Sequence, residues 1–117
     1  MKPLTNIESF LQRFDNFKDG EIRSIEIISP TDIVITLAAQ DKSRDFDWIS
    51  MKLEFNGTDD ARLLDKSKLS LIDMSDGINI TSTNNNYIFG LGSSIKGLKN
   101  SSCFVSCENI RYEEGLF

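Results

Sequence analysis

The chain has 117 residues, a formal net charge of −5 and no histidine. Its 39% hydrophobic and 26% charged residues are typical of a globular protein, so we expect a single domain over residues 1–117 rather than a disordered or fibrous chain. The negative charge argues against nucleic-acid binding, which needs clustered lysine and arginine to displace counterions from phosphate.

A helix is predicted near the start of the chain, over residues 5–15. Thr5 and Glu8 fit a capping box at its N-terminus. The apolar residues of this segment recur at helical spacing on one face, as Ile7, Phe10, Leu11 and Phe14. Because a short apolar helix must lie on another element, we expect it to pack on a sheet, with Phe17 filling the junction.

Consecutive strands are predicted over residues 22–55, and the rest of the fold is organised around them. The apolar positions recur with a period of two, as Ile25 and Ile27, then Ile33, Ile35 and Leu37, then Ile49, Met51, Leu53 and Phe55. Pro30 and Asp32 favour a chain reversal between the first two strands. The pattern predicts an antiparallel sheet with one buried face.

Shorter elements follow. We expect an edge strand over residues 61–64, a hairpin from residues 78–82 and 87–91 with its tip at residues 84–86, and a last strand over residues 102–112. Residues 69–74 fit either a strand or a turn of helix. The glycines and serines of residues 90–101 predict the longest flexible segment. The fold class is therefore α+β and mostly β: an amphipathic helix on an antiparallel sheet, arranged as a meander or a two-sheet sandwich.

The cysteines and the apolar content indicate in which cellular compartment the protein is expected. Cys103 and Cys107 are four residues and about 13 Å apart on one face of the predicted strand, too far for a disulfide, so we interpret them as reduced core thiols. No apolar run approaches the roughly 20 residues that span a bilayer, and the first residues lead into polar sequence rather than the apolar core of a signal peptide. We expect no membrane partner and a cytoplasmic location.

The sequence offers little catalytic or metal-binding chemistry. Without histidine there is no Ser-His-Asp or Cys-His arrangement and no imidazole ligand for zinc, so we expect a protein that is not an enzyme. Residues 15–26 resemble a calcium loop, but Phe17 and Arg23 stand at two ligand positions. Gly90, Gly92 and Gly97 lack the remaining residues of a phosphate-binding loop. We predict no cofactor and no metal.

Carboxylates gather in the predicted loops, and with one aromatic residue they form the candidate partner-binding set. Its members are Asp45, Asp47, Trp48, Asp59, Asp60, Asp73 and Asp76. Loop charges are often only solvated surface, but loops brought to one end of a sheet would form an acidic rim for a basic protein partner. Trp48 either anchors such a surface or is covered by the predicted helix, and the sequence leaves both open.

Three segments carry a resemblance to a known group of proteins. They are residues 17–22 (Phe-Lys-Asp-Gly-Glu-Ile), residues 48–57 (Trp-Ile-Ser-Met-Lys-Leu-Glu-Phe-Asn-Gly) and residues 110–114 (Ile-Arg-Tyr-Glu-Glu). In these the chain resembles small bacterial proteins of unknown or immunity-type role. Some members carry histidine where this chain has Lys18, so no histidine-dependent property is transferred. The resemblance implies a β-rich fold with an N-terminal helix and, for immunity-type members, neutralisation of a cognate toxin.

Our leading hypothesis is a bacterial protein-binding module, an immunity or inhibitor protein whose acidic surface binds a basic toxin domain. The alternative is a small-ligand or carbohydrate-binding β domain that uses Trp48, Tyr87 and the tip at residues 84–86. A carboxylate-based hydrolase is a third possibility, and it requires two carboxyl groups about 5 to 9.5 Å apart across a cleft.

Overall fold

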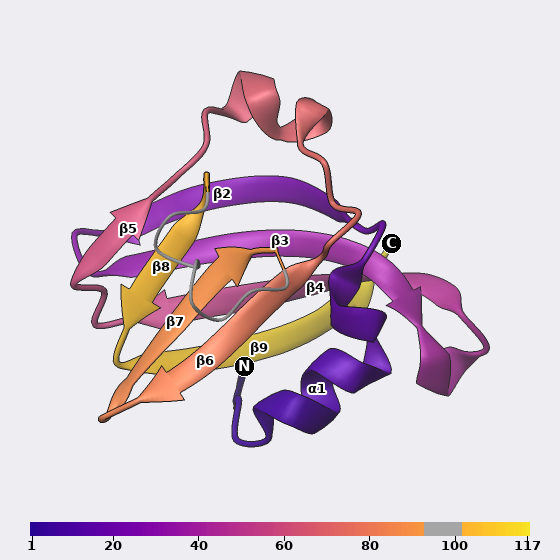
Figure 1. Cartoon of the computed structure of the whole chain (residues 1–117), viewed down its shortest axis with the longest axis horizontal. Helices are drawn as coiled ribbons and strands as arrows, with labels where there is room; N and C mark the ends of the chain where they lie inside the picture. Colours follow the sequence, from indigo (N-terminus) through magenta and orange to yellow (C-terminus); the bar gives the residue numbers. More distant parts are fainter. Residues whose placement is uncertain (93–101) are drawn as a thin grey trace.

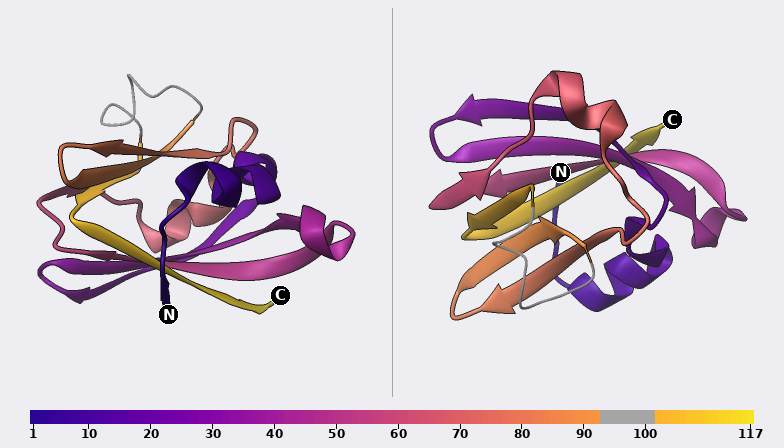
Figure 2. Two further views of the ribbon diagram at one scale, coloured as in Figure 1. Left: turned by 90° about the horizontal axis from the view of Figure 1, so that it is seen from below. Right: turned by 45° about the horizontal axis from the view of Figure 1, so that its top comes forward.

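The computed structural model describes residues 1–92 and 102–117, and it is a mostly β fold of two antiparallel sheets with a helix beside them (Figure 1). The predicted flexible segment, including Gly97, lies largely outside the described residues. The two sheets face each other as layers, so the sandwich arrangement is the one adopted (Figure 2). No helix in the described ranges has the length and apolar character needed to cross a bilayer.

The larger sheet contains five strands within the described residues. In spatial order they are β1 (Lys2–Pro3), β9 (Asn109–Leu116), β4 (Asp47–Asn56), β3 (Asp32–Asp41) and β2 (Glu21–Ser29), all paired antiparallel. The predicted run of strands over residues 22–55 is therefore confirmed as β2, β3 and β4. In β4 the buried face is the predicted one, with Ile49, Met51, Leu53 and Phe55 directed into the core.

The alternation predicted for the first strand is only partly correct. Ile25 is buried, but the side chain of Ile27 is 69% exposed. β2 is the last strand of its sheet in the described structure, and its register with β3 shifts between Ile22 and Ser24 and again between Ile27 and Ser29. A side chain near the end of an edge strand has neighbours on one side only, so the period of two does not bury it.

The smaller sheet contains four strands within the described residues. Their order is β5 (Asp60–Arg62), β8 (Phe104–Cys107), β7 (Asn86–Leu91) and β6 (Ile78–Thr83). The predicted hairpin of residues 78–91 is confirmed as β6 and β7. Residues 66–71 form η3 (Lys66–Leu71), a 3-10 helix, so the helical alternative is the correct one for the start of the ambiguous segment.

The single strand predicted over residues 102–112 is wrong. β8 belongs to the smaller sheet and β9 to the larger one, and the chain changes sheets at Glu108. Cys107 is buried before the change and Ile110 after it, although they are three positions apart, a spacing that places residues of one strand on opposite faces. The alternation restarts when the chain crosses to the facing sheet, which a period read from one strand does not anticipate.

The helix α1 (Ile7–Arg13) lies on the same face of the larger sheet as the smaller sheet does, beside β6 (Figures 1 and 2). The predicted capping box is wrong, because the N-cap is Asn6, whose Oδ1 accepts a hydrogen bond from the Ser9 N–H at 3.0 Å. The apolar face is confirmed: Phe10 and Phe14 are buried. The helix is followed by η1 (Asp15–Phe17), and the ring of Phe17 is fully buried and stacks on Phe14 at 4.9 Å.

The two cysteines are buried thiols in the core, as predicted. Burial raises the pKa of the Cys103 thiol to about 11. Burial, with the nearby Asp59 carboxylate, raises the pKa of the Cys107 thiol to about 12. Both sulfurs are therefore protonated near neutral pH and behave as small hydrophobic groups.

Candidate functional site

The β3–β4 hairpin carries two exposed aromatic side chains, Trp48 of the candidate set and Phe46, which the sequence patterns did not single out. It turns through η2 (Lys42–Arg44) and then through Asp45 and Phe46, which have φ angles of 54° and 65°. Consecutive non-glycine residues in the left-handed region are uncommon. The Phe46 N–H donates to the Asp41 carbonyl at 2.9 Å, which holds the turn, and the Phe46 side chain is 56% exposed.

Trp48 follows on the open face of the larger sheet, opposite α1 and the smaller sheet. Its side chain is 37% exposed, so of the two possibilities left by the sequence, the helix does not cover it. The Trp48 ring contacts that of Phe117, with centroids 5.5 Å apart, and the guanidinium of Arg23 lies 4.7 Å from the Phe117 ring centroid. An indole, a phenyl ring and a guanidinium from β4, the end of β9 and β2 thus form one row on this face.

An ion-pair network fixes the base of the hairpin. Asp41, at the end of β3, is fully buried and receives two hydrogen bonds from Arg13 of α1, at 2.9 and 2.6 Å. Arg13 and Arg44 each also bond Glu114 of β9, at 2.5 and 2.9 Å. The Arg13 hydrogen bonds, supported by those from Ser43, lower the pKa of the Asp41 carboxyl to about 2. The carboxylates of this network are consequently neutralised within the molecule.

Asp45 and Asp47 differ from these carboxylates. Both are exposed, and neither makes an ion pair with any residue in the described part of the chain. They flank Phe46 and precede Trp48. We use the name tip patch for Asp45, Phe46, Asp47, Trp48 and Phe117. The patch wraps around the end of the hairpin: Trp48 is on the open face, whereas Asp47 lies opposite Asp41 in the ladder and so on the side of α1. It combines exposed aromatic rings with two carboxylates that make no ion pair within the described residues.

Asp59 and Asp60 lie at the opposite end of the sheet from the tip patch. They follow β4, whereas Asp47 begins it, and ten residues of strand span about 30 Å. Asp60 opposite Ser106 belongs to the β5–β8 ladder, and Asp59 accepts a hydrogen bond from the Asn86 side chain at 3.3 Å. These two carboxylates therefore do not share a surface with Trp48.

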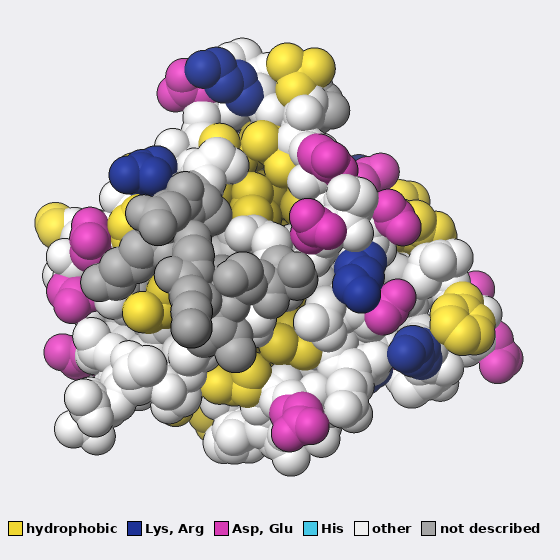
Figure 3. Space-filling view, viewed as in Figure 1, with side chains coloured by type: hydrophobic (Ala, Val, Ile, Leu, Met, Phe, Trp, Pro, Cys, Tyr) yellow, Lys and Arg dark blue, Asp and Glu magenta, His cyan; other side chains and the backbone are white. Residues whose placement is uncertain are grey.

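Asp73 and Asp76 occupy a third place, in the loop between η3 and β6. Asp73 accepts a hydrogen bond from the Ser75 N–H at 2.9 Å, and this bond lowers the pKa of the Asp73 carboxyl. The loop is tied to the start of β2 by a bond from the Asp19 N–H to the Met74 carbonyl at 2.8 Å. The carboxylates on the face in Figure 3 accordingly form separate groups rather than one acidic rim.

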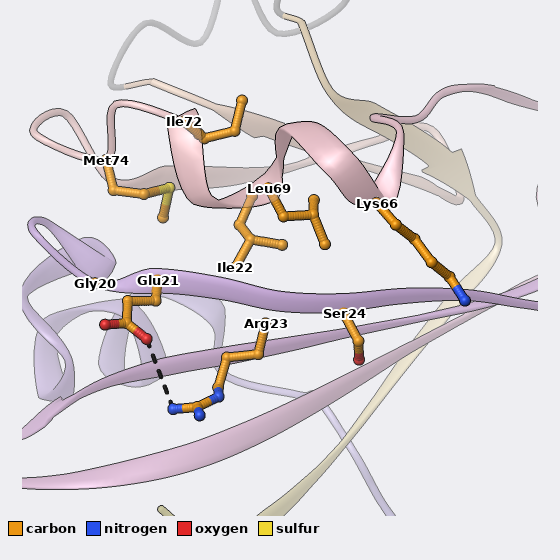
Figure 4. Close-up of a pocket in the computed structure, with 9 residues that line it drawn as sticks. All are labelled: Gly20, Glu21, Ile22, Arg23, Ser24, Lys66, Leu69, Ile72 and Met74. Atoms are coloured by element: carbon orange, nitrogen blue, oxygen red, sulfur yellow. Dashed lines mark ion pairs between the residues drawn. The ribbon is translucent and has the colours of Figure 1, made fainter.

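A groove that the sequence gave no sign of runs between β2 and η3. It has a volume of about 590 Å³, and Ile22, Leu69, Ile72 and Met74 supply its apolar side chains (Figure 4). In the space-filling view, hydrophobic side chains are visible between η3 at the top and the body of the molecule (Figure 3). Sequence patterns do not reveal such a groove because it depends on where η3 folds back along β2.

The groove bears on the alternative functions. Its lining contains one carboxylate, Glu21, which lies 3.6 Å from the Arg23 guanidinium, so it does not supply the carboxylate pair of a hydrolase.

Trp48 and Tyr87 are on different sheets, so they do not line a common carbohydrate site. Residues 15–26, which resembled a calcium loop, form η1 and the start of β2, and the described residues contain no cluster of three or more potential metal ligands.

Comparison with known proteins gives no relative for this chain. No protein-family model matches it, and no curated protein or solved structure matches it.

Proposed function

We propose that this chain is a non-enzymatic protein-binding module, a bacterial immunity or inhibitor protein that holds a basic partner through the tip patch. The observation that carries the proposal is the exposed Trp48–Phe117 ring pair on a hairpin whose tip bears two exposed carboxylates, neither of which makes an ion pair with a described residue. Tryptophan is enriched among the few residues that supply most of the binding energy of protein interfaces, and exposed carboxylates favour a cationic partner.

The fold supports this use of the hairpin. Interface residues bind best when they are held in place before association, because less conformational entropy is then lost. The Arg13–Asp41–Glu114 network ties the hairpin base to α1 and β9, and the contact with Phe117 orients Trp48. The tip patch is thus presented on a braced hairpin. The proposal includes a cytoplasmic location, where buried thiols such as Cys103 and Cys107 remain reduced.

The proposal is tested by capture of the partner. The full chain, the Trp48→Ala variant and the Asp59→Asn/Asp60→Asn variant are immobilised and exposed to lysate of the native host at low and high salt. We expect one stoichiometric basic protein on the wild type and on the control, with at least tenfold less on Trp48→Ala and less at high salt. The captured protein should arrest growth when expressed alone, and co-expression of the wild-type chain should relieve the arrest.

Equal capture by wild type and Trp48→Ala would remove the tip patch from the proposal. A captured partner whose toxicity the chain does not relieve would leave a binding module without an immunity role.

A further inference from the structure

The groove between β2 and η3 has the parts of a strand-docking site. Within the described structure β2 pairs only with β3, so backbone N–H and C=O groups along its other edge lie outside any ladder. Residues 20–24 of this edge border the groove along its length, about 13 Å of extended chain. An added strand uses such backbone groups for affinity and places alternate side chains in adjoining pockets for specificity.

The side chains divide cleanly between the two faces of β2. Ile22 points up toward Leu69 of η3, whereas Glu21 and Arg23 point to the opposite face, where they pair with each other (Figure 4). This is the ordinary alternation of a strand, and the register shift between Ile22 and Ser24 then inserts Arg23 as an extra residue, so that Ile22 and Ile25 are both buried although they are three positions apart. The groove wall is left apolar, and the irregular edge disfavours indiscriminate pairing with other strands.

Charge distinguishes the two ends of the groove. Met74 and Ile72 lie at the Gly20 end, where the Met74 carbonyl accepts from the Asp19 N–H. Lys66 lies at the other end and reaches toward β2 near Ser24 (Figure 4). Its ammonium group makes no ion pair with the described residues. An occupant is therefore expected to be apolar at one end and anionic at the other.

We propose that this groove binds an extended peptide segment of a partner protein, antiparallel to residues 20–24, with an acidic side chain against Lys66. Because side chains alternate along a strand, the segment carries the acid first and apolar residues two and four positions later. η3 stands beside β2 at this edge (Figures 1 and 4), so a second copy that paired edge to edge would bring its own η3 against this one. We therefore assign the groove to a single extended segment. The tip patch is a different surface, although Arg23, which lines the groove, also contacts Phe117 of that patch.

A peptide selection tests the proposal. Random eight-residue peptides displayed on phage are selected against the full chain and, in parallel, against the Lys66→Glu variant. We expect the wild type to enrich peptides with an acidic residue followed by apolar residues at the second and fourth positions after it. The Lys66→Glu variant should enrich the same apolar pattern preceded by lysine or arginine. Failure to enrich any pattern, or the same charge preference on both targets, would overturn the proposal.

A matched pair of variants then tests whether the best enriched peptide binds in the groove. Leu69 lines the groove, whereas Leu71 of the same η3 does not and is 79% exposed. By calorimetry we expect Leu69→Ala to weaken binding at least tenfold, and Leu71→Ala and Trp48→Ala to change it less than twofold. A loss with Leu71→Ala as large as that with Leu69→Ala would contradict the site. Trp48→Ala removes the tryptophan on which the proposed function rests. Unchanged peptide binding by this variant would therefore show that the groove acts whether or not the proposed function is correct.

Discussion

Arg13 of α1 and Asp41 of β3 are joined by two parallel hydrogen bonds, and the carboxylate is fully buried while the guanidinium is partly open to solvent. Removal of the cation would leave a buried charge unpaired. We expect Arg13→Met to lower the free energy of unfolding by about 2 to 3 kcal/mol, below the roughly 3 to 5 kcal/mol of a fully buried pair because solvent reaches Arg13. Urea denaturation followed by circular dichroism measures this change.

The control is the same substitution at Arg23. Its pair with Glu21 is long, at 3.6 Å, and both side chains are exposed, so we expect Arg23→Met to cost less than about 1 kcal/mol. Equal losses for the two variants would show that the Arg13–Asp41 pair is no stronger than a surface contact.

The same pair predicts a pH dependence of stability. The pKa of Asp41 is lowered from 3.8 to about 2 in the folded chain, so the pair stabilises the fold above about pH 4. This stabilisation, about 2 kcal/mol for a shift of that size, is lost as the pH falls from about 4 through about 2. Unfolding free energies measured between pH 6 and pH 2 should show the gap between wild type and Arg13→Met narrowing over that range. The other lowered carboxyls are common to both proteins and cancel, so a constant gap would contradict the assignment.

Fluorescence reports the ring pair directly, because Trp48 is the single tryptophan of the chain. The Phe117 ring shields one side of the indole. We expect Phe117→Ala to shift the emission maximum to longer wavelength and to raise the acrylamide quenching constant. Phe46→Ala, which removes an exposed ring of the same patch, should change neither quantity appreciably. Quenching that is the same in wild type and Phe117→Ala would mean that the two rings do not pack in solution.

The buried thiols predict slow chemical modification. The pKa values of Cys103 and Cys107, about 11 and 12, keep both sulfurs protonated at pH 8, and thiolates are the reactive species. We expect Ellman's reagent to modify neither cysteine of the native chain within minutes and both in denaturant. Rapid reaction without denaturant would contradict their place in the core.

Local patterns in the sequence predicted the parts of this fold that local forces determine. In β4, Ile49, Met51 and Leu53 alternate with polar residues. This alternation predicted both the strand and its buried face, because successive side chains of a strand point to opposite faces. The change of sheet at Glu108 was not predictable in this way. It depends on which strands lie on either side, and those come from distant parts of the chain.

The candidate site residues also divide into those whose positions follow from local sequence and those whose positions depend on distant parts of the chain. Asp45, Asp47 and Trp48 were predicted together because they are neighbours along the chain. Asp59 and Asp60 were added to the set because they are acidic loop residues, although strand length carries them to the other end of the sheet. The burial of Asp41 also escaped prediction, since its partner Arg13 is 28 positions away.

Charge at the tip patch predicts how the partner associates. Replacement of Asp45 and Asp47 by asparagine removes two carboxylates that make no ion pair in the described part of the chain, so the fold should be unaffected and only the electrostatic field outside the hairpin should change. We expect the association rate with the captured partner to fall at least threefold at low salt and to depend less steeply on salt. The dissociation rate should change little, because rim charges act mainly on encounter. Stopped-flow fluorescence of Trp48 measures both rates.

The Asp59→Asn/Asp60→Asn variant provides the charge-matched control for this experiment. It changes the net charge by the same two units at the opposite end of the sheet, about 30 Å from Asp47. If the patch rather than the total charge steers the partner, this control should keep nearly the wild-type rate, since about 30 Å exceeds the screening length of roughly 10 Å in 0.1 M salt. If both variants slowed association equally, the effect would come from net charge. The carboxylates of the hairpin would then have no specific role in binding, and only its aromatic contacts would remain in the proposal.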